Sequence, residues 1–236
     1  MTPAARPDLV GARPTRKVGR AQPRGDRTRE ATIDETIRCI NEEGFAAASA
    51  NHIAERAGVT WGVIQYHFGD RSGLLSAVIA HGFQDFQRAI QSVPVPDSPS
   101  RRRVEAVVGA AWSAFSSPAS RASLEILISS RSGQDEARAT QLEAMARGMR
   151  ALSIVLLGNG VASERRGAVI GELLWATLRG LVMAQMLTSS PIDSSRERAL
   201  LVDLVSGLLD EADVQGHPAP ALQPSDGGSR STVVGG

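Results

Sequence analysis

The sequence has only one cysteine, Cys39, so no disulfide can form within the chain. It also lacks the run of eighteen or so apolar residues that a membrane-spanning helix needs. The longest apolar stretch, residues 173 to 187, is interrupted by Arg179. The N-terminus is rich in arginine and proline and has none of the apolar core of a signal peptide. These absences predict a cytoplasmic protein with no membrane partner.

Signatures of catalysis and of metal binding are missing as well. There is no Gly-x-Ser-x-Gly pattern and no phosphate-binding loop, so nothing indicates an enzyme or a cofactor. The four histidines are scattered, and no two of them have the spacing of ligands on one helix, so no metal site is expected from them. Cys39 is interpreted as a small core or boundary residue rather than a redox sensor. His81 is interpreted as a helix-surface residue, with a place in a pocket as the alternative.

The net charge of +1 conceals an uneven distribution. Residues 1 to 29 carry eight basic side chains and two acidic ones, hence +6, which leaves −5 for the rest of the chain. A basic arm on a mildly acidic body indicates a polyanionic partner such as nucleic acid. A solvated tail that only keeps the protein in solution is the alternative, and charge alone does not separate the two.

From Thr28 onward, apolar residues recur with the period of a helix. Ile33, Ile37 and Ile40 fall on one face, for example, and glycines or prolines separate one helical segment from the next. About nine helices are expected. The fourth begins at residue 70 and ends at a linker over residues 93–100. The others cover residues 28–44, 49–58, 60–67, 101–115, 121–130, 134–157, 163–189 and 194–214. Neither the alternation of a β-strand nor an internal repeat occurs, so the predicted fold class is all-α.

Residues 49 to 68 have the layout of a helix-turn-helix. Small alanines allow the two helices to approach closely, and Gly58 can adopt the positive φ that the turn requires. Val59 and Ile64 are expected to hold the second helix against the first. The outer side is then left to residues suited to nucleic acid, because helix N-termini hold phosphates and glutamine reads adenine in the major groove. These outward residues are Thr60, Trp61, Gly62, Gln65, Tyr66 and His67.

Residues 29 to 75 resemble the DNA-binding domain of the TetR family of bacterial transcription regulators. The matching residues stand at the family's usual spacings and are Gly44-Phe45, residues 53 to 60 (IAERAGVT), Gly62, residues 66 to 68 (YHF) and Leu74-Leu75. The C-terminal part of the chain matches the family only in its length and its helical character. The resemblance implies a sequence-specific DNA-binding regulator.

The resemblance also implies roles for single residues. Thr60 corresponds to a phosphate-contacting cap, and Arg71 stands where a lysine commonly reaches the DNA backbone. Contacts to bases or phosphates are expected from Gln65, Tyr66 and His67, and the full set of expected DNA contacts is Ser49, Thr60, Trp61, Gly62, Gln65, Tyr66, His67 and Arg71.

Four positions depart from the family pattern. Gln65 stands where a tyrosine is typical, Trp61 where a small polar or basic residue is common, and Ala48 where a threonine is frequent. His52 replaces the usual acid, so the capping box that would start at Ser49 is lost. We expect an altered choice of DNA site rather than a loss of binding.

The helix-turn-helix segment is not basic by itself. Residues 27 to 75 carry five basic and seven acidic side chains, net −2, which is unfavourable for DNA binding. Most of the acids lie in the first helix, and the arm can supply positive charge. Deletion of residues 1 to 26 is therefore expected to weaken DNA binding and to flatten its dependence on salt.

The later helices carry methionines and aromatic residues, which line adaptable apolar cavities as well as ordinary cores. If the resemblance holds, a small effector binds among them and shifts the protein toward a form that cannot bind DNA. The candidate ligand-binding residues are Phe86, Trp112, Phe115, Met145, Met149, Trp175, Arg179 and Met183. Arg179 is expected to pair with Glu172, with an anionic ligand as the alternative.

The last two helices predict a homodimer. Two recognition helices must lie about 34–36 Å apart to reach successive turns of a palindromic operator, which requires a two-fold axis. The apolar stripe from Leu200 to Leu209 is too wide for a lone surface helix. In TetR-like proteins the equivalent helices form a four-helix bundle with the partner; burial within one subunit is the alternative.

The sequence thus predicts four parts. They are a disordered basic arm (1–26), a DNA-binding domain (27–87, with the helix-turn-helix at 49–68), a ligand-binding and dimerisation domain (88–214) and a flexible tail (215–236). The expected function is that of a repressor released from double-stranded DNA by a small, largely apolar effector. A regulator that answers to a protein partner and, less favoured, a helical enzyme are the alternatives.

Overall fold

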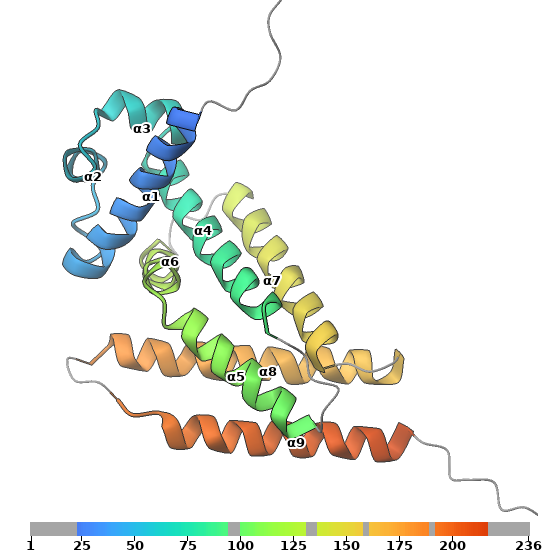
Figure 1. The fold of residues 1–236 in the computed structure, drawn as a ribbon. Helices are drawn as coiled ribbons and strands as arrows, with labels where there is room; N and C mark the ends of the chain where they lie inside the picture. The colour runs from blue at the N-terminus through green and yellow to red at the C-terminus, as the bar shows by residue number, and fades with distance from the viewer. Residues whose placement is uncertain (1–22, 94–99, 131–135, 158–160, 189–191, 217–236) are drawn as a thin grey trace, which may run out of the picture.

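The computed structural model describes residues 23–93, 100–130, 136–157, 161–188 and 192–216, and in these ranges the chain contains helices and no strand. The helices are α1 (Pro23–Glu43), α2 (Ala50–Arg56), α3 (Trp61–Phe68), α4 (Arg71–Gln91), α5 (Ser100–Phe115), α6 (Pro118–Ser129), α7 (Glu136–Leu157), α8 (Val161–Met186) and α9 (Ser195–Gly216). Helices α1–α3 lie at one end of the molecule, and α8 and α9 lie side by side at the other (Figure 1). The all-α prediction is confirmed.

The first helix begins earlier than predicted. α1 starts at Pro23 and not at Thr28. Proline is favourable at a first helical position because it has no N–H group that would need a partner there. Residues 23–26 are therefore helical, although the sequence assigned them to a disordered arm. The rest of that arm, and the predicted tail from residue 217 onward, lie outside the described residues.

The start of α6 also differs from the prediction. The Ser-Ser-Pro sequence suggested a break before Arg121, but α6 begins at Pro118. Ser117 caps the helix by accepting a hydrogen bond from the Ser120 N–H, and proline is favourable in a first turn. The residues that were interpreted as a break are therefore a helix start.

A first apolar cluster, here called the N-terminal core, holds α1 to α4 together. Ile33, Ile37 and Ile40 of α1 are buried in it, as their spacing predicted. Its other large members are Ile53 of α2, Ile64 of α3, and Leu74, Leu75, Val78 and Ile79 of α4. Ala119, Ala122 and Ile126 of α6 belong to the same cluster, so a helix of the C-terminal part completes the core of the N-terminal part.

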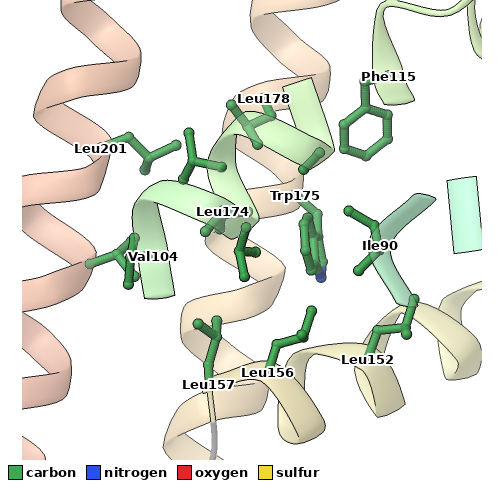
Figure 2. Close-up of a cluster of buried hydrophobic side chains, with 14 of the residues drawn as sticks. Ile90, Val104, Phe115, Leu152, Leu156, Leu157, Leu174, Trp175, Leu178 and Leu201 are labelled. Atoms are coloured by element: carbon green, nitrogen blue, oxygen red, sulfur yellow. The ribbon is translucent and has the colours of Figure 1, made fainter. Parts of the chain in front are cut away.

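A second cluster, the C-terminal core, fills the space between α4, α5, α7, α8 and α9. Figure 2 shows Ile90 of α4 and Phe115 of α5 beside Trp175, with leucines of α7 and α8 around them. Trp175 is buried and donates a hydrogen bond from Nε1 to Ser153 Oγ at 2.7 Å. Because α4 contributes to both cores, the predicted division near residue 87 falls inside a continuous helix.

Direct hydrogen bonds also join α6 to the N-terminal helices. The carboxylate of Glu125 accepts a hydrogen bond from the Phe45 N–H at 2.6 Å, and Asn41 Nδ2 donates to the Pro118 carbonyl at 3.0 Å. Where α6 crosses α4, a Cβ atom on Gly82 would meet Ser123 Oγ and the Ala119 carbonyl. Helix α6 therefore cannot shift without disturbing α4 or the connection between α1 and α2.

By length and composition alone, residues Arg165–Met186 of α8 could cross a membrane. In the structure Leu174, Leu178 and Val182 of this segment are buried, and α8 packs against α5, α7 and α9. A central helix of a helical core has the same apolar composition.

Candidate nucleic-acid interface

The turn between α2 and α3 has the geometry that the sequence predicted. Gly58 adopts φ +64°, in the left-handed region that favours glycine. The Val59 N–H donates to the Ala54 carbonyl at 2.9 Å and so closes the turn. Ile53 and Ile64 are both fully buried, which holds α3 across α2. The two helices therefore form a helix-turn-helix with a fixed orientation.

Helix α2 is held in place at both ends. Ser49 caps it by accepting a hydrogen bond from the His52 N–H at 3.3 Å. Near the other end, Arg56 pairs with three carboxylates of α1, those of Glu35, Glu42 and Glu43. The hydrogen bonds to Glu42 and Glu35 raise the pKa of the Arg56 guanidinium further above its usual value. The acids of α1 thus bind α2, which explains in part why they accumulate in a nucleic-acid-binding segment.

The outer face of α3 is open to solvent. Tyr66 is 81% exposed and Trp61 is 37% exposed, and Thr60, Gly62 and Gln65 are exposed as well. Thr60 is the N-cap residue, yet its hydroxyl makes no capping hydrogen bond. The side chains are therefore positioned to contact something outside this chain.

The start of α4 is built close to the end of α3. Asp70 caps α4 by accepting a hydrogen bond from the Gly73 N–H at 2.8 Å. A Cβ atom on Gly73 would overlap the Phe68 carbonyl oxygen, so only glycine allows this approach. Arg71 donates from Nε to the Ala48 carbonyl at 2.7 Å and lies over the Phe45 ring. Its side chain therefore has a role inside the protein in addition to the DNA contact expected from the sequence.

Two further groups lie at the end of α3. His67 is half-buried, and its ring is 5.0 Å from that of Tyr66. The Arg29 guanidinium of α1 lies 5.3 Å from the centroid of the Phe68 ring, which places one positive charge next to α3. No local pattern predicts this contact, because Arg29 and Phe68 are far apart along the chain.

The helix-turn-helix geometry agrees with the comparisons to known proteins. A family model described as bacterial regulatory proteins, tetR family, matches residues 33–78. The HTH-type transcriptional regulator BetI of Escherichia coli K12 is 30% identical over 182 residues, which are 73% of this chain and 89% of BetI. The chain belongs to the TetR family. It is therefore a DNA-binding transcriptional regulator, as its relatives are, and not an enzyme.

Solved structures of TetR-like fold agree. A transcriptional regulator from Rhodococcus sp. Rha1 aligns with a TM-score of 0.61 at 20% identity, over 78% of this chain and 96% of that one. The multidrug binding protein EbrR, complexed with imidazole, aligns with a TM-score of 0.54 at 21% identity, over 83% of this chain and 93% of EbrR. At these identities the likeness shows a common fold.

The C-terminal part of this TetR protein contains a mainly apolar cavity of about 180 Å³ between α4, α6 and α7. Of the residues suggested for a ligand site, Phe86, Phe115, Met145, Met149 and Arg179 line it. The other three are not among its lining residues. Trp175 is buried in the C-terminal core beside Phe86, Met183 is half-buried on α8, and Trp112 lies under the Arg198 guanidinium. Arg179 was expected to pair with Glu172, but Glu172 pairs with Arg150 instead, at 3.2 Å.

Several cavity residues were not foreseen. The cavity face of α6 is made by Ser120, Ser123, Leu124 and Leu127, none of which is aromatic or a methionine. Selection by residue type alone therefore missed them. The helical spacing of 120, 123, 124 and 127 could have indicated a common face.

A second, larger depression of about 590 Å³ lies between α1, α4, α5 and α6. Charged groups on its wall include Asp34, Arg38, His81 and Asp85, of which His81 and Asp85 lie 3.4 Å apart. An apolar effector fits the first cavity better because that cavity exposes mostly carbon to its contents.

Proposed function

We propose that this TetR regulator is a repressor that leaves its operator when a small, largely apolar effector binds between α4, α6 and α7. The observation that carries the proposal is that residues of α4 and α6 both line the cavity and belong to the N-terminal core. Leu124 and Leu127 of α6 line the cavity, while Ala122 and Ile126 of that helix are buried in the N-terminal core. A change of packing in the cavity is therefore transmitted to the helix-turn-helix through α4 and α6.

The DNA contacts in this proposal come from the exposed side of α3 and its surroundings. Gln65 and Tyr66 face bases in the major groove, and the free hydroxyl of Thr60 contacts phosphate. Ser49, Trp61, Gly62, His67 and Arg71 complete the surface. The Arg29 guanidinium adds positive charge next to α3, and the arginines among residues 1–22 add further positive charge to the chain.

The effector is proposed to be small and to carry one polar group. The cavity volume of about 180 Å³ is below the roughly 300–1,000 Å³ of typical ligand pockets. Flexible Met145 and Met149 can enlarge it by changing rotamer. Arg179 lies at its edge and can accept an anionic group. EbrR, with its bound imidazole, supports small-molecule binding by this fold.

The active unit is proposed to be a homodimer formed through α8 and α9. On α8, Val169 and Leu173 are 57% and 53% exposed, and on α9, Leu200 and Leu204 are 59% and 57% exposed. The two helices lie next to each other at the end opposite α3 (Figure 1), and we propose that these residues form one apolar surface there. Such a surface on a lone subunit is unfavourable in water and is covered in a four-helix bundle.

A regulator that answers to a protein partner is the second candidate. It would require a filled interior and a large exposed patch besides the dimer surface. The cavity between α4, α6 and α7 favours the small effector instead.

The test uses a panel of small aliphatic and aromatic carboxylates with their matching amides. Carboxylates that fit are expected to raise the melting temperature and to weaken DNA binding, measured by fluorescence anisotropy with DNA that the protein selects. The cavity-filling substitution Leu124→Trp should abolish the response while DNA binding persists, and Leu187→Trp, at an 85% exposed site, is the matched control. If Leu124→Trp responds as the unaltered protein does, the effector binds elsewhere.

A further inference from the structure

Three potential metal ligands meet where α1 and α2 contact each other. Cys39 and Glu43 are four residues apart on α1 and therefore share a face of the helix. His52 approaches them from the first turn of α2. One ligand atom from each residue lies within 4.8 Å of the other two. The sequence did not predict this arrangement, because the three residues meet only when α2 packs against α1.

The donor atoms suit a zinc-class ion. His52 Nε2 lies 2.9 Å from Glu43 Oε2, and a tetrahedral ion with bonds of about 2.0–2.3 Å needs ligand atoms about 3.5 Å apart. Small rotations of the side chains are therefore enough. Nitrogen, sulfur and oxygen donors together favour Zn²⁺ over Mg²⁺ or Ca²⁺, which prefer oxygen alone.

The surrounding charges allow a dication. Glu43 uses Oε1 for its ion pair with Arg56, so Oε2 stays on the side of His52. Glu35 and Glu42 also bind Arg56, and Glu35 pairs with Arg38 as well, at 2.8 Å, so three carboxylates surround two guanidiniums. This excess negative charge attracts a cation and offsets the repulsion from Arg56.

Access and protonation are also compatible with binding. Cys39 is fully buried, whereas the side chains of His52 and Glu43 are 36% and 37% exposed, so an ion enters from their side. Burial, reinforced by the Glu43 carboxylate, raises the pKa of the Cys39 thiol and so favours its protonated form when no ion is bound. Coordination replaces this proton, and Cys39–SH with Zn²⁺ gives Cys39–S⁻–Zn²⁺ with one H⁺ released to the buffer.

We propose that Cys39, Glu43 and His52 form a Zn²⁺ site, with water as the fourth ligand. The ion joins the last turns of α1 to the start of α2. Since α3 packs on α2, the site acts on the DNA-binding surface directly and does not involve the cavity between α4, α6 and α7. It is thus a second regulatory input, independent of the effector.

The test is a Co²⁺ titration of the reduced full-length protein, followed by absorbance. The chain has one cysteine, so a thiolate-to-cobalt charge-transfer band can only come from Cys39. We expect one Co²⁺ per chain, with a band that Zn²⁺ removes by displacement and that proton release accompanies. No band at saturating Co²⁺ would overturn the proposal and leave the cluster as an ion-pair network only.

Variants show whether Co²⁺ binds at Cys39, Glu43 and His52 or at another histidine. His52→Asn is expected to weaken Co²⁺ binding at least tenfold, and Cys39→Ser to remove the band. His81→Asn is the matched control, because His81 faces Asp85 at 3.4 Å with no thiol nearby. His52 and Glu43 are at the surface, so His52→Asn and Glu43→Gln remain informative if the core substitution Cys39→Ser fails to fold. A band of unchanged affinity in both surface variants would contradict the assignment.

Discussion

At the scale of the residue, we expect DNA binding to depend on the solvent-exposed side chains of α3. Gln65→Ala and Tyr66→Ala are expected to weaken binding to selected DNA by about 1–3 kcal/mol each, because each removes a contact to a base or phosphate and neither side chain belongs to a core cluster. Gln84→Ala, at an exposed site on α4, is the control and should bind as the unaltered protein does. The measurement is fluorescence anisotropy, with melting temperatures to confirm folding. Equal affinities for all three variants would exclude α3 as the reading helix.

Residue roles could be predicted where a local rule governs them. The positive φ of Gly58 and the cap at Ser49 follow from nearest neighbours in the sequence, and both are confirmed. The role of Arg71 inside the protein could not be predicted, because its contacts with Ala48 and Phe45 bring together residues far apart in the chain. For the same reason, the contact of Cys39 and Glu43 on α1 with His52 on α2 could not be predicted from a local pattern.

At the scale of the element, the crossing of α4 and α6 needs glycine. Gly82→Ala is expected to lower the free energy of unfolding by about 1–3 kcal/mol, since the added methyl group would press against the backbone of α6. Gly109→Ala on α5 is the control. A Cβ there meets no atom within 4 Å, so we expect a gain of up to about 1 kcal/mol from helix propensity. Urea denaturation of both variants measures the difference, and equal stabilities would show that the crossing tolerates a side chain.

A second element-scale prediction concerns the hydrogen bond between α6 and the segment after α1. Glu125→Ala removes the acceptor for the half-buried Phe45 N–H and should destabilise the protein by about 1–3 kcal/mol. Glu125→Gln keeps an acceptor oxygen and should retain most of the stability. If the two variants unfold at the same urea concentration, the hydrogen bond is not what joins the helices.

The presence and approximate extent of the helices could be predicted from the period of the apolar residues and from the caps. The first residues of α1 and α6 could not. Proline was interpreted as a break before α6 and as disorder before α1, although it is favourable in a first turn. The contribution of α6 to the N-terminal core depends on packing between distant segments, which no local pattern contains.

At the scale of the whole molecule, the proposed dimer covers the exposed apolar residues of α8 and α9 with a second copy of the chain. Leu204→Glu is expected to convert the proposed dimer to monomers, because it places a charge at a 57% exposed leucine of α9 that belongs to neither core. Ile128→Glu, at a 43% exposed site on α6, is the control and should leave the dimer intact. Light scattering coupled to gel filtration gives the masses. A dimer that survives Leu204→Glu would place the interface elsewhere.

The central claim is that α3 reads duplex DNA twice per dimer. Selection of bound sequences from a pool of random duplex DNA by the full-length protein tests it most directly. We expect enrichment of a palindrome whose half-sites are centred about one helical turn apart, or 10–10.5 base pairs. Enrichment of an asymmetric site, or of no sequence at all, would contradict the account.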